Sequence, residues 1–131
     1  MINFIGLKEQ QEILLKKINT RMSNVLEHGK YILGPEVSEL EEALSDFVGS
    51  KYCVTCSSGT DALLMSLMAK DLGPDDAVIV PSFTYIASAE VVELLGAKTY
   101  FCDINPNTFN IETGNLEDIC KKISKDDKNL K

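Results

Sequence analysis

The fold of this chain is decided by the stretch Cys53-Val54-Thr55-Cys56-Ser57-Ser58-Gly59-Thr60-Asp61-Ala62-Leu63. This stretch is typical of a short buried strand that runs into a turn of hydroxyl residues and glycine and then opens an amphipathic helix. The first turn of a helix has unpaired backbone N–H groups and the positive end of the helix dipole, which favour an anion. Gly59 lets the backbone approach a ligand closely, and Ser58 and Thr60 add hydroxyl donors. The stretch therefore predicts a site for a phosphorylated small molecule.

The same residues have a plainer interpretation. Ser57 to Thr60 also make a good helix cap of the kind found in proteins that bind nothing there, and the stretch alone leaves the two interpretations equally open. Cys53 and Cys56 have C-x-x-C spacing, but residues three apart on a strand lie on opposite faces and no second pair completes a zinc site. We interpret the four cysteines of the chain as reduced thiols, and this pair as small buried hydrophobes without a metal.

Outward from this stretch, helical and strand patterns alternate along the chain. The spacing of apolar residues, with glycine and proline near the ends of the apolar segments, predicts several helices. They lie at 8–27, from Pro35 to Gly49, at 60–72, in the segment that ends at Leu95 before Gly96, and after a cap at Asn115. Strands are predicted at 52–56, 77–80 and 98–102. Strands separated by helices at this spacing form βαβ units, so we expect an α/β fold with helices on a mostly parallel sheet.

In an open parallel sheet, ligands collect beyond the carboxyl ends of the strands. The segments after Cys56, Val80 and Cys102 should therefore gather around one crevice. The second of these segments contains Tyr85, whose ring could face the predicted phosphate site, although an aromatic residue in a first helical turn is more often part of the core. The third segment ends in Asp103, which by itself most often pins a turn.

Composition limits the class of protein. The chain has 131 residues, of which 44% are hydrophobic and 25% charged, as in ordinary globular proteins. No apolar run approaches the roughly 20 residues of a membrane span, and the start of the chain does not resemble a secretory signal, so we expect a cytoplasmic protein without a membrane partner. The net charge of −7 disfavours binding to nucleic acid.

Five segments, read in order, resemble one known family. They are Phe4-Ile5-Gly6-Leu7-Lys8-Glu9-Gln10, Tyr31-Ile32-Leu33-Gly34-Pro35-Glu36-Val37, Ser57-Ser58-Gly59-Thr60-Asp61-Ala62-Leu63, Pro81-Ser82-Phe83-Thr84-Tyr85 and Asp103-Ile104-Asn105-Pro106. With this order and spacing the chain resembles the N-terminal part of a DegT/DnrJ/EryC1/StrS sugar aminotransferase, a family that uses pyridoxal 5'-phosphate. Within the family it is most similar to members that aminate the 3-keto group of a UDP-linked 2-acetamido-2-deoxy hexuronic acid.

The resemblance implies a fold and a set of ligand-binding residues. It implies the large domain of a fold-type-I PLP-dependent transferase, in which Ser58, Gly59, Thr60 and Asp61 hold the cofactor phosphate and Tyr85 stacks on the pyridine ring. It also implies that Gly34 and Pro35 lie near the nucleotide-sugar pocket. Gly6 stands where the family usually has Asp, which removes any polar contact that this side chain would make.

Transamination requires a lysine for the Schiff base and a carboxylate on the pyridinium nitrogen, and the resemblance places both beyond residue 131. We therefore expect a truncated, single partial domain over 1–131, with N-terminal helices in 1–49 and βα units in 50–131. No catalytic residue is expected in this chain, and alone it should bind the cofactor weakly or not at all and be inactive.

Further expectations concern partners and alternative functions. The resemblance implies a nucleotide sugar and an amino-acid donor as ligands. It also implies a homo-oligomer, since members of the family are dimers. Truncation favours self-association as well, because a sheet that is cut partway leaves an unpaired edge. Two alternatives stay open: a PLP-dependent sugar dehydratase or lyase of the same family, and a non-catalytic remnant that serves as an interaction or regulatory domain.

Overall fold

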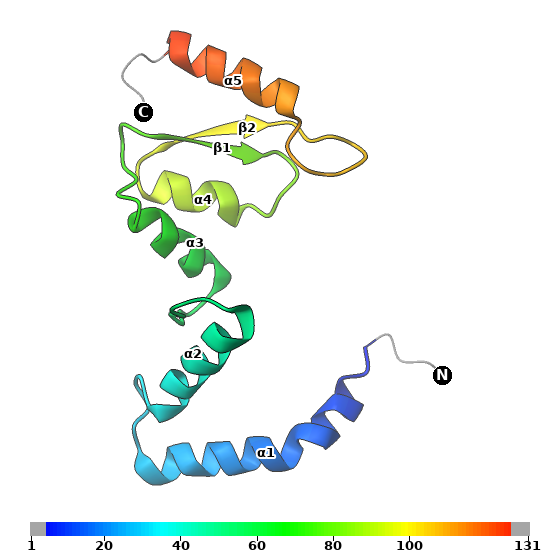
Figure 1. Cartoon of the computed structure of the whole chain (residues 1–131), viewed down its shortest axis with the longest axis vertical. Helices are drawn as coiled ribbons and strands as arrows, with labels where there is room; N and C mark the ends of the chain where they lie inside the picture. Colours follow the sequence, from blue (N-terminus) through cyan, green and yellow to red (C-terminus); the bar gives the residue numbers. More distant parts are fainter. Residues whose placement is uncertain (1–4, 127–131) are drawn as a thin grey trace. The chain divides into compact units, whose positions relative to one another are not determined.

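The structure is a computed structural model that describes residues 5–126 (Figure 1). Its elements are α1 (Leu7–His28), α2 (Pro35–Val48), α3 (Gly59–Met68), β1 (Ala77–Pro81), α4 (Ala87–Leu94), β2 (Lys98–Cys102) and α5 (Thr113–Asp126). The chain divides into two compact units, Met1–Thr55 and Cys56–Lys131. That 1–131 form one partial domain stays a prediction. Phe4, the first residue of the first family-like segment, lies outside the described residues.

The first unit contains α1 and α2, and both confirm helices predicted from the sequence. Gly29 ends α1 in the left-handed conformation, with φ 66°, and its N–H donates to the carbonyl of Val25. Pro35 is the first residue of α2, and Gly49 ends that helix with φ 69°. A left-handed residue after the last turn suits glycine because it has no Cβ to clash, so these boundaries follow directly from residue type.

Polar contacts join α1 to the start of α2. Arg21 forms an ion pair with Glu39. At the end of α1, the backbone N–H of Lys30 donates to Nδ1 of His28 at 3.0 Å, so the ring proton lies on Nε2, which donates to the Glu36 carboxylate at 3.1 Å. This hydrogen bond from His28 holds the pKa of Glu36 below its ordinary value.

The contact between His28 and Glu36 makes the first unit sensitive to acid. Because the folded pKa of Glu36 is depressed, the contact contributes its full stability above the ordinary value of 4.5 and loses it as the pH falls through the folded pKa. We expect the first unit to be destabilised in that range, and Glu36→Gln to reduce the pH dependence. Urea unfolding at neutral and acid pH tests this, with Glu42→Gln as the control, because no ion pair is recorded for Glu42 within residues 5–126. Equal pH dependence in the two variants would contradict the expectation.

The strand predicted at 52–56 is wrong. The segment is extended but pairs with no strand among the described residues. Its polar groups bind side chains instead: the N–H and hydroxyl of Thr55 donate to the Glu41 carboxylate at 2.8 and 2.9 Å, and the hydroxyl of Ser50 donates to the carbonyl of Tyr52 at 2.9 Å. The hydrogen bond from the Thr55 backbone lowers the pKa of Glu41. A β-strand needs a neighbouring strand for its backbone groups, and apolar residues alone do not provide one.

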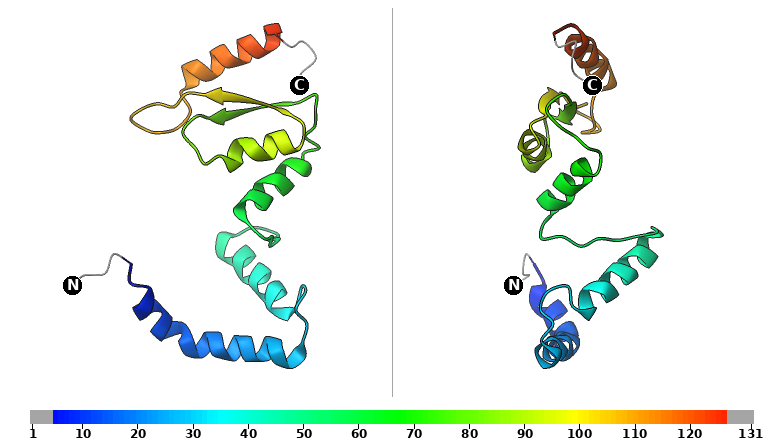
Figure 2. Two further views of the ribbon diagram at one scale, coloured as in Figure 1. Left: turned by 180° about the vertical axis from the view of Figure 1, so that it is seen from behind. Right: turned by 90° about the vertical axis from the view of Figure 1, so that its left-hand side faces the viewer.

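The second unit contains a parallel pair of strands with helices on both sides. β1 and β2 pair in register from Ala77 opposite Lys98 to Pro81 opposite Cys102, which confirms the strands predicted at 77–80 and 98–102 and the parallel arrangement. Helix α4 contacts both strands and packs on α3, whereas α5 contacts β2. Figures 1 and 2 show α4 and α5 on opposite sides of the strand pair.

The core of this unit is small. Val91, Val92 and Ala97 form its buried centre, and four partly buried side chains pack against it: Leu64, Leu67, Leu72 and Val78. Cys102 is fully buried, which raises the pKa of its thiol, whereas Cys53 is half-buried and Cys56 and Cys120 are exposed. The interpretation of Cys53 and Cys56 as a buried pair is therefore wrong for Cys56. All four cysteines are free.

Two helix ends differ from the sequence predictions. Helix α3 ends at Met68 rather than Leu72, because Asp71 takes the left-handed conformation with φ 55° and the N–H of Leu72 bonds back to the carbonyl of Leu67. Helix α5 begins at Thr113, so Asn115 lies in its first turn and is not its cap.

No helix within residues 5–126 is long and apolar enough to cross a membrane.

Candidate functional site

The turn before α3 is a helix cap built by Ser58. The Ser58 hydroxyl oxygen accepts a hydrogen bond from the backbone N–H of Asp61 at 3.1 Å, and the same hydroxyl donates to Asp61 Oδ2 at 3.0 Å. Ser57 donates to the same carboxylate oxygen. Ser58 itself is extended, as residues that cap a helix start usually are. The interpretation of this turn as a helix cap is thus confirmed. The phosphate site at the same turn stays a prediction.

Two backbone donors remain at this helix start. The N–H of Asp61 is used by the cap, whereas no partner for the N–H of Gly59 or Thr60 is recorded among the described residues. A Cβ placed on Gly59 would meet nothing within 4 Å, so the space beside this backbone is open. Two adjacent N–H groups at the positive end of a helix, beside open space, fit one face of a phosphate.

The Asp61 carboxylate lies at the same helix start. The hydrogen bonds from Ser57 and Ser58 lower its pKa, so it is ionised at neutral pH and interacts favourably with the helix dipole. In this structure both serine hydroxyls are directed at Asp61, so a phosphate would find the two backbone N–H groups but would compete for the hydroxyl of Ser58. The Thr60 hydroxyl has no recorded partner within residues 5–126.

Tyr85 lies in the connection between β1 and α4. Its side chain is 77% exposed, so the alternative of a core aromatic does not hold in this structure. Its carbonyl accepts the N–H of Ser88 at 3.1 Å, which ties Tyr85 to the start of α4. An exposed ring at this position is available to a ligand, and its stacking role stays a prediction.

The structure brings some of the predicted residues together and leaves others apart. Ser58 to Asp61 form one turn, and Tyr85 belongs to a different loop of the same unit. Figures 1 and 2 show that α3 and α4 both run opposite to the strands, so both helices begin on the side where β1 and β2 end. No hydrogen bond or ring contact joins Tyr85 to the start of α3 within the described part of the chain.

Gly34 and Pro35, the predicted sugar-binding residues, belong to the first unit. Gly34 is buried at the start of α2, and its carbonyl accepts the N–H of Val37 at 3.0 Å. A Cβ on Gly34 would lie 2.4 Å from the carbonyl oxygen of Lys30. This close approach of two backbone segments explains the glycine without a ligand, and a role in substrate binding stays a prediction.

The loops beyond the two strands are tied to each other by residues to which sequence analysis gave no site role. The N–H of Ser82 donates to the carbonyl of Cys102 at 2.8 Å, and the Ser82 hydroxyl lies 3.3 Å from Asp103 Oδ1. Asp103 also accepts the N–H of Ile104 at 2.9 Å, so it pins a turn as its residue type predicts. The predicted parallel strands already implied that the segments after Val80 and Cys102 lie at one edge of the sheet, but no sequence signal pointed to the contacts of Ser82.

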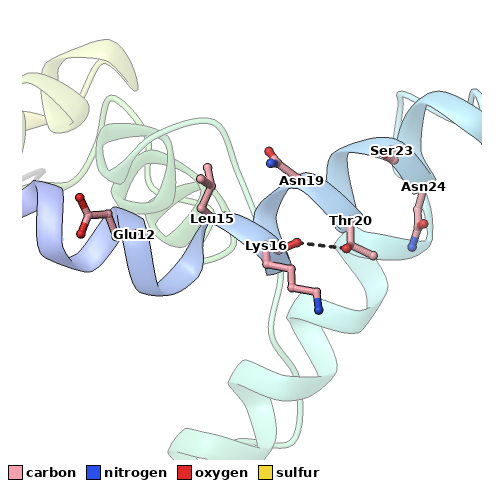
Figure 3. Close-up of a pocket in the computed structure, with 7 residues that line it drawn as sticks. All are labelled: Glu12, Leu15, Lys16, Asn19, Thr20, Ser23 and Asn24. Atoms are coloured by element: carbon pink, nitrogen blue, oxygen red, sulfur yellow. Dashed lines mark hydrogen bonds between the residues drawn. The ribbon is translucent and has the colours of Figure 1, made fainter.

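A hollow on the first unit does not coincide with the predicted site. It is lined by Glu12, Leu15, Lys16, Asn19, Thr20, Ser23 and Asn24. Figure 3 shows these side chains fanning out from α1, with the Thr20 hydroxyl bonded to the Lys16 carbonyl at 3.0 Å. Because every lining residue comes from one helix, the hollow is an open helix surface without convergent polar groups, and we assign it no function.

The sequence of this chain is similar to one family of aminotransferases. The profile of the DegT/DnrJ/EryC1/StrS aminotransferase family matches residues 12–126. The chain is 56% identical over 117 residues to the UDP-2-acetamido-2-deoxy-3-oxo-D-glucuronate aminotransferase of Pseudomonas aeruginosa, covering 89% of this chain and 33% of that protein. The chain thus spans about a third of the length of this curated relative.

Solved structures agree with the sequence comparison. A DegT DnrJ EryC1 StrS aminotransferase from Brucella abortus matches with a TM-score of 0.89 and 40% identity, over 99% of this chain and 35% of that one. The PLP form of the sugar aminotransferase Spr1654 from Streptococcus pneumoniae, described as putative, matches with a TM-score of 0.72 and 36% identity, over 76% of this chain and 25% of that one. The architecture described above is therefore shared with part of these aminotransferase structures.

Proposed function

The chain belongs to the DegT/DnrJ/EryC1/StrS aminotransferase family, and on this premise we propose that it forms the N-terminal part of the cofactor-binding domain of a PLP-dependent nucleotide-sugar aminotransferase. The observation that carries the proposal is the start of α3, where the N–H groups of Gly59 and Thr60 lack a described partner beside open space. These groups fit the phosphate of the cofactor, and the exposed ring of Tyr85 fits its pyridine face.

The proposed reaction moves an amino group from an amino-acid donor to a keto-sugar. The cofactor supplies an electron sink for this chemistry when it is bound. The residues of this chain would bind and orient the cofactor: Gly59 and Thr60 at its phosphate and Tyr85 at its ring. None of the lysines of the chain matches the family's Schiff-base position, so we propose that residues 1–131 alone do not transaminate.

The proposed substrate is a UDP-linked 3-keto sugar acid. Its support is the relative that is 56% identical, whose name specifies UDP-2-acetamido-2-deoxy-3-oxo-D-glucuronate. Gly34 and Pro35 are the residues that we propose to lie near this substrate. A homo-oligomer is part of the same proposal, because large apolar side chains such as Ile13, Ile32 and Phe47 are at least 79% exposed and would be covered in a larger assembly.

Titration of the isotopically labelled chain with pyridoxal phosphate tests the cofactor site. We expect weak, saturable changes in the amide resonances of Gly59 and Thr60, because their N–H groups would donate to the phosphate. Borohydride treatment followed by mass spectrometry should find no pyridoxyl mass on any lysine, and no transaminase activity should be measurable. A lysine adduct formed in stoichiometric amount, or resonance changes confined to other residues, would contradict the proposal.

Neutralising Asp61 sharpens this test. We expect Asp61→Asn to strengthen binding of pyridoxal phosphate by about three- to tenfold, because it removes a negative charge near the phosphate, while its amide oxygen can still accept from Ser57 and Ser58. The control is Asp71→Asn, which makes the same change of charge just beyond the other end of α3 and keeps a residue that tolerates the left-handed conformation. An equal gain in both variants would assign the effect to net charge and contradict the site.

A further inference from the structure

The segment from Asp103 to Glu112 folds into a small hairpin beyond β2. Ile104 and Ile111 form an isolated antiparallel bridge. The N–H of Asn105 donates to the carbonyl of Asn110 at 2.9 Å, and the N–H of Glu112 donates to the carbonyl of Asp103 at 3.1 Å. This segment therefore has a defined conformation that its own backbone pairing maintains.

The side chain of Asn105 organises the hairpin. Its Oδ1 accepts the N–H of Asn107 at 2.9 Å and that of Thr108 at 3.2 Å, and its Nδ2 donates to Glu112 at 2.7 Å. The result is a turn that uses both ends of the amide. The turn leads into Phe109, whose N–H donates to the carbonyl of Asn105 at 2.8 Å.

Phe109 has a backbone conformation that is unfavourable for its residue type. Its φ of 59° lies in the left-handed region, which costs energy for a residue with a Cβ and which glycine or asparagine would adopt more easily. The strain is not repaid by burial, because the side chain of Phe109 is 59% exposed. Residues in sparsely populated backbone regions persist where the surrounding structure holds them, so the contacts of the Phe109 ring bear on this conformation.

The ring of Phe109 contacts the loop that carries Tyr85. Its centroid lies 5.6 Å from that of Phe83, with the planes at 36°. Phe83 lies two residues before Tyr85, and the preceding Ser82 is tied to Cys102 and Asp103 on the β2 side. The connection between β1 and α4 is thus attached to the hairpin by one polar contact and one ring contact at adjacent residues. Figures 1 and 2 show the hairpin and this connection on the same side of the strand pair.

We propose that Phe109 is a positioning residue for Tyr85, because it braces Phe83 and so fixes the loop from which the Tyr85 ring projects. The inference rests on the proposed function, in which Tyr85 contacts the cofactor ring. Phe109 itself touches no ligand in this scheme. Its strained conformation and the amide network of Asn105 serve to direct the aromatic ring at Phe83 rather than to fill a core.

Amide hydrogen exchange in the full chain tests the brace without a ligand. The N–H of Ser88 donates to the carbonyl of Tyr85, so its protection reports the order of the loop. We expect Phe109→Leu to raise its exchange rate about two- to tenfold, the range expected from loss of an aromatic pair. Phe109→Tyr should restore both the protection and the ring-current shift of Phe83. Phe101→Leu is the matched control, because Phe101 is 57% exposed and makes no recorded ring contact among the described residues.

The possible outcomes are distinct. Unchanged protection of Ser88 in Phe109→Leu, or an equal loss in Phe101→Leu, would overturn the inference. If Phe109→Leu does not fold, Asn105→Ala replaces it. This change removes the side-chain contacts of the turn without altering Phe83 or Phe109, and it should raise exchange at Ser88 in the same way. Pyridoxal phosphate is then titrated against the Tyr85 ring resonances. Saturable shifts at the amides of Gly59 and Thr60 without any shift at the Tyr85 ring refute the proposed ring contact, whereas the exchange data still decide the brace.

Discussion

Replacement of Val92 by alanine is expected to lower the free energy of unfolding of the second unit by about 2–3 kcal/mol. The side chain of Val92 is 0% exposed and lies in a cluster with Val91 and Ala97, against which Leu64 and Leu67 pack. The change removes two methyl groups from apolar surroundings and leaves a cavity that neighbours fill only in part. Since few side chains form this core, each contributes a large share of its stability.

Leu94 in the same helix provides the control for this prediction. It is 64% exposed, so Leu94→Ala removes a larger side chain but should change the free energy of unfolding by no more than about 0.5 kcal/mol. Urea unfolding, followed through amide signals of β1 and β2, measures both variants. If Leu94→Ala destabilises the unit as much as Val92→Ala, the core described above is not the one that stabilises the protein.

Replacement of Gly34 by alanine is expected to destabilise the first unit by about 1–3 kcal/mol, the usual cost of forcing extra atoms into a packed site. The new Cβ would lie 2.4 Å from the carbonyl oxygen of Lys30. Because that oxygen is part of the backbone, the connection between α1 and α2 must move to relieve the contact. The expected consequence is loss of the hydrogen bond between His28 and Glu36, which spans this connection.

Gly6→Ala is the matched control in the same unit. A Cβ there would meet Oε2 of Glu9 at 3.2 Å, and this flexible side chain can turn away. Thermal unfolding by circular dichroism and the side-chain resonances of His28 report the two variants. Equal stabilities would show that the chain between Lys30 and Gly34 adapts freely, and would leave a ligand as the remaining explanation for this glycine.

Features that depend on residue type and local period could be predicted from the sequence alone. Gly29 and Gly49 ended their helices and Pro35 began one, because each residue has a backbone preference that needs no partner. The strands at 77–80 and 98–102 were likewise predicted, since their apolar runs lie between clear turn signals. A helix cap within Ser57 to Thr60 was one of two interpretations open from the sequence, and in the structure Ser58 is the cap of α3.

Features that depend on residues distant in sequence follow from how the chain folds. The segment at 52–56 has the composition of a strand, yet its conformation follows from Glu41, which binds Thr55. The need for glycine at position 34 comes from the Lys30 carbonyl, and the conformation of Phe109 is matched to a ring in another loop. Local preferences are properties of single residues and can be predicted from the sequence, whereas pairing, close approach and ring contact are properties of two segments and exist only once the chain has folded.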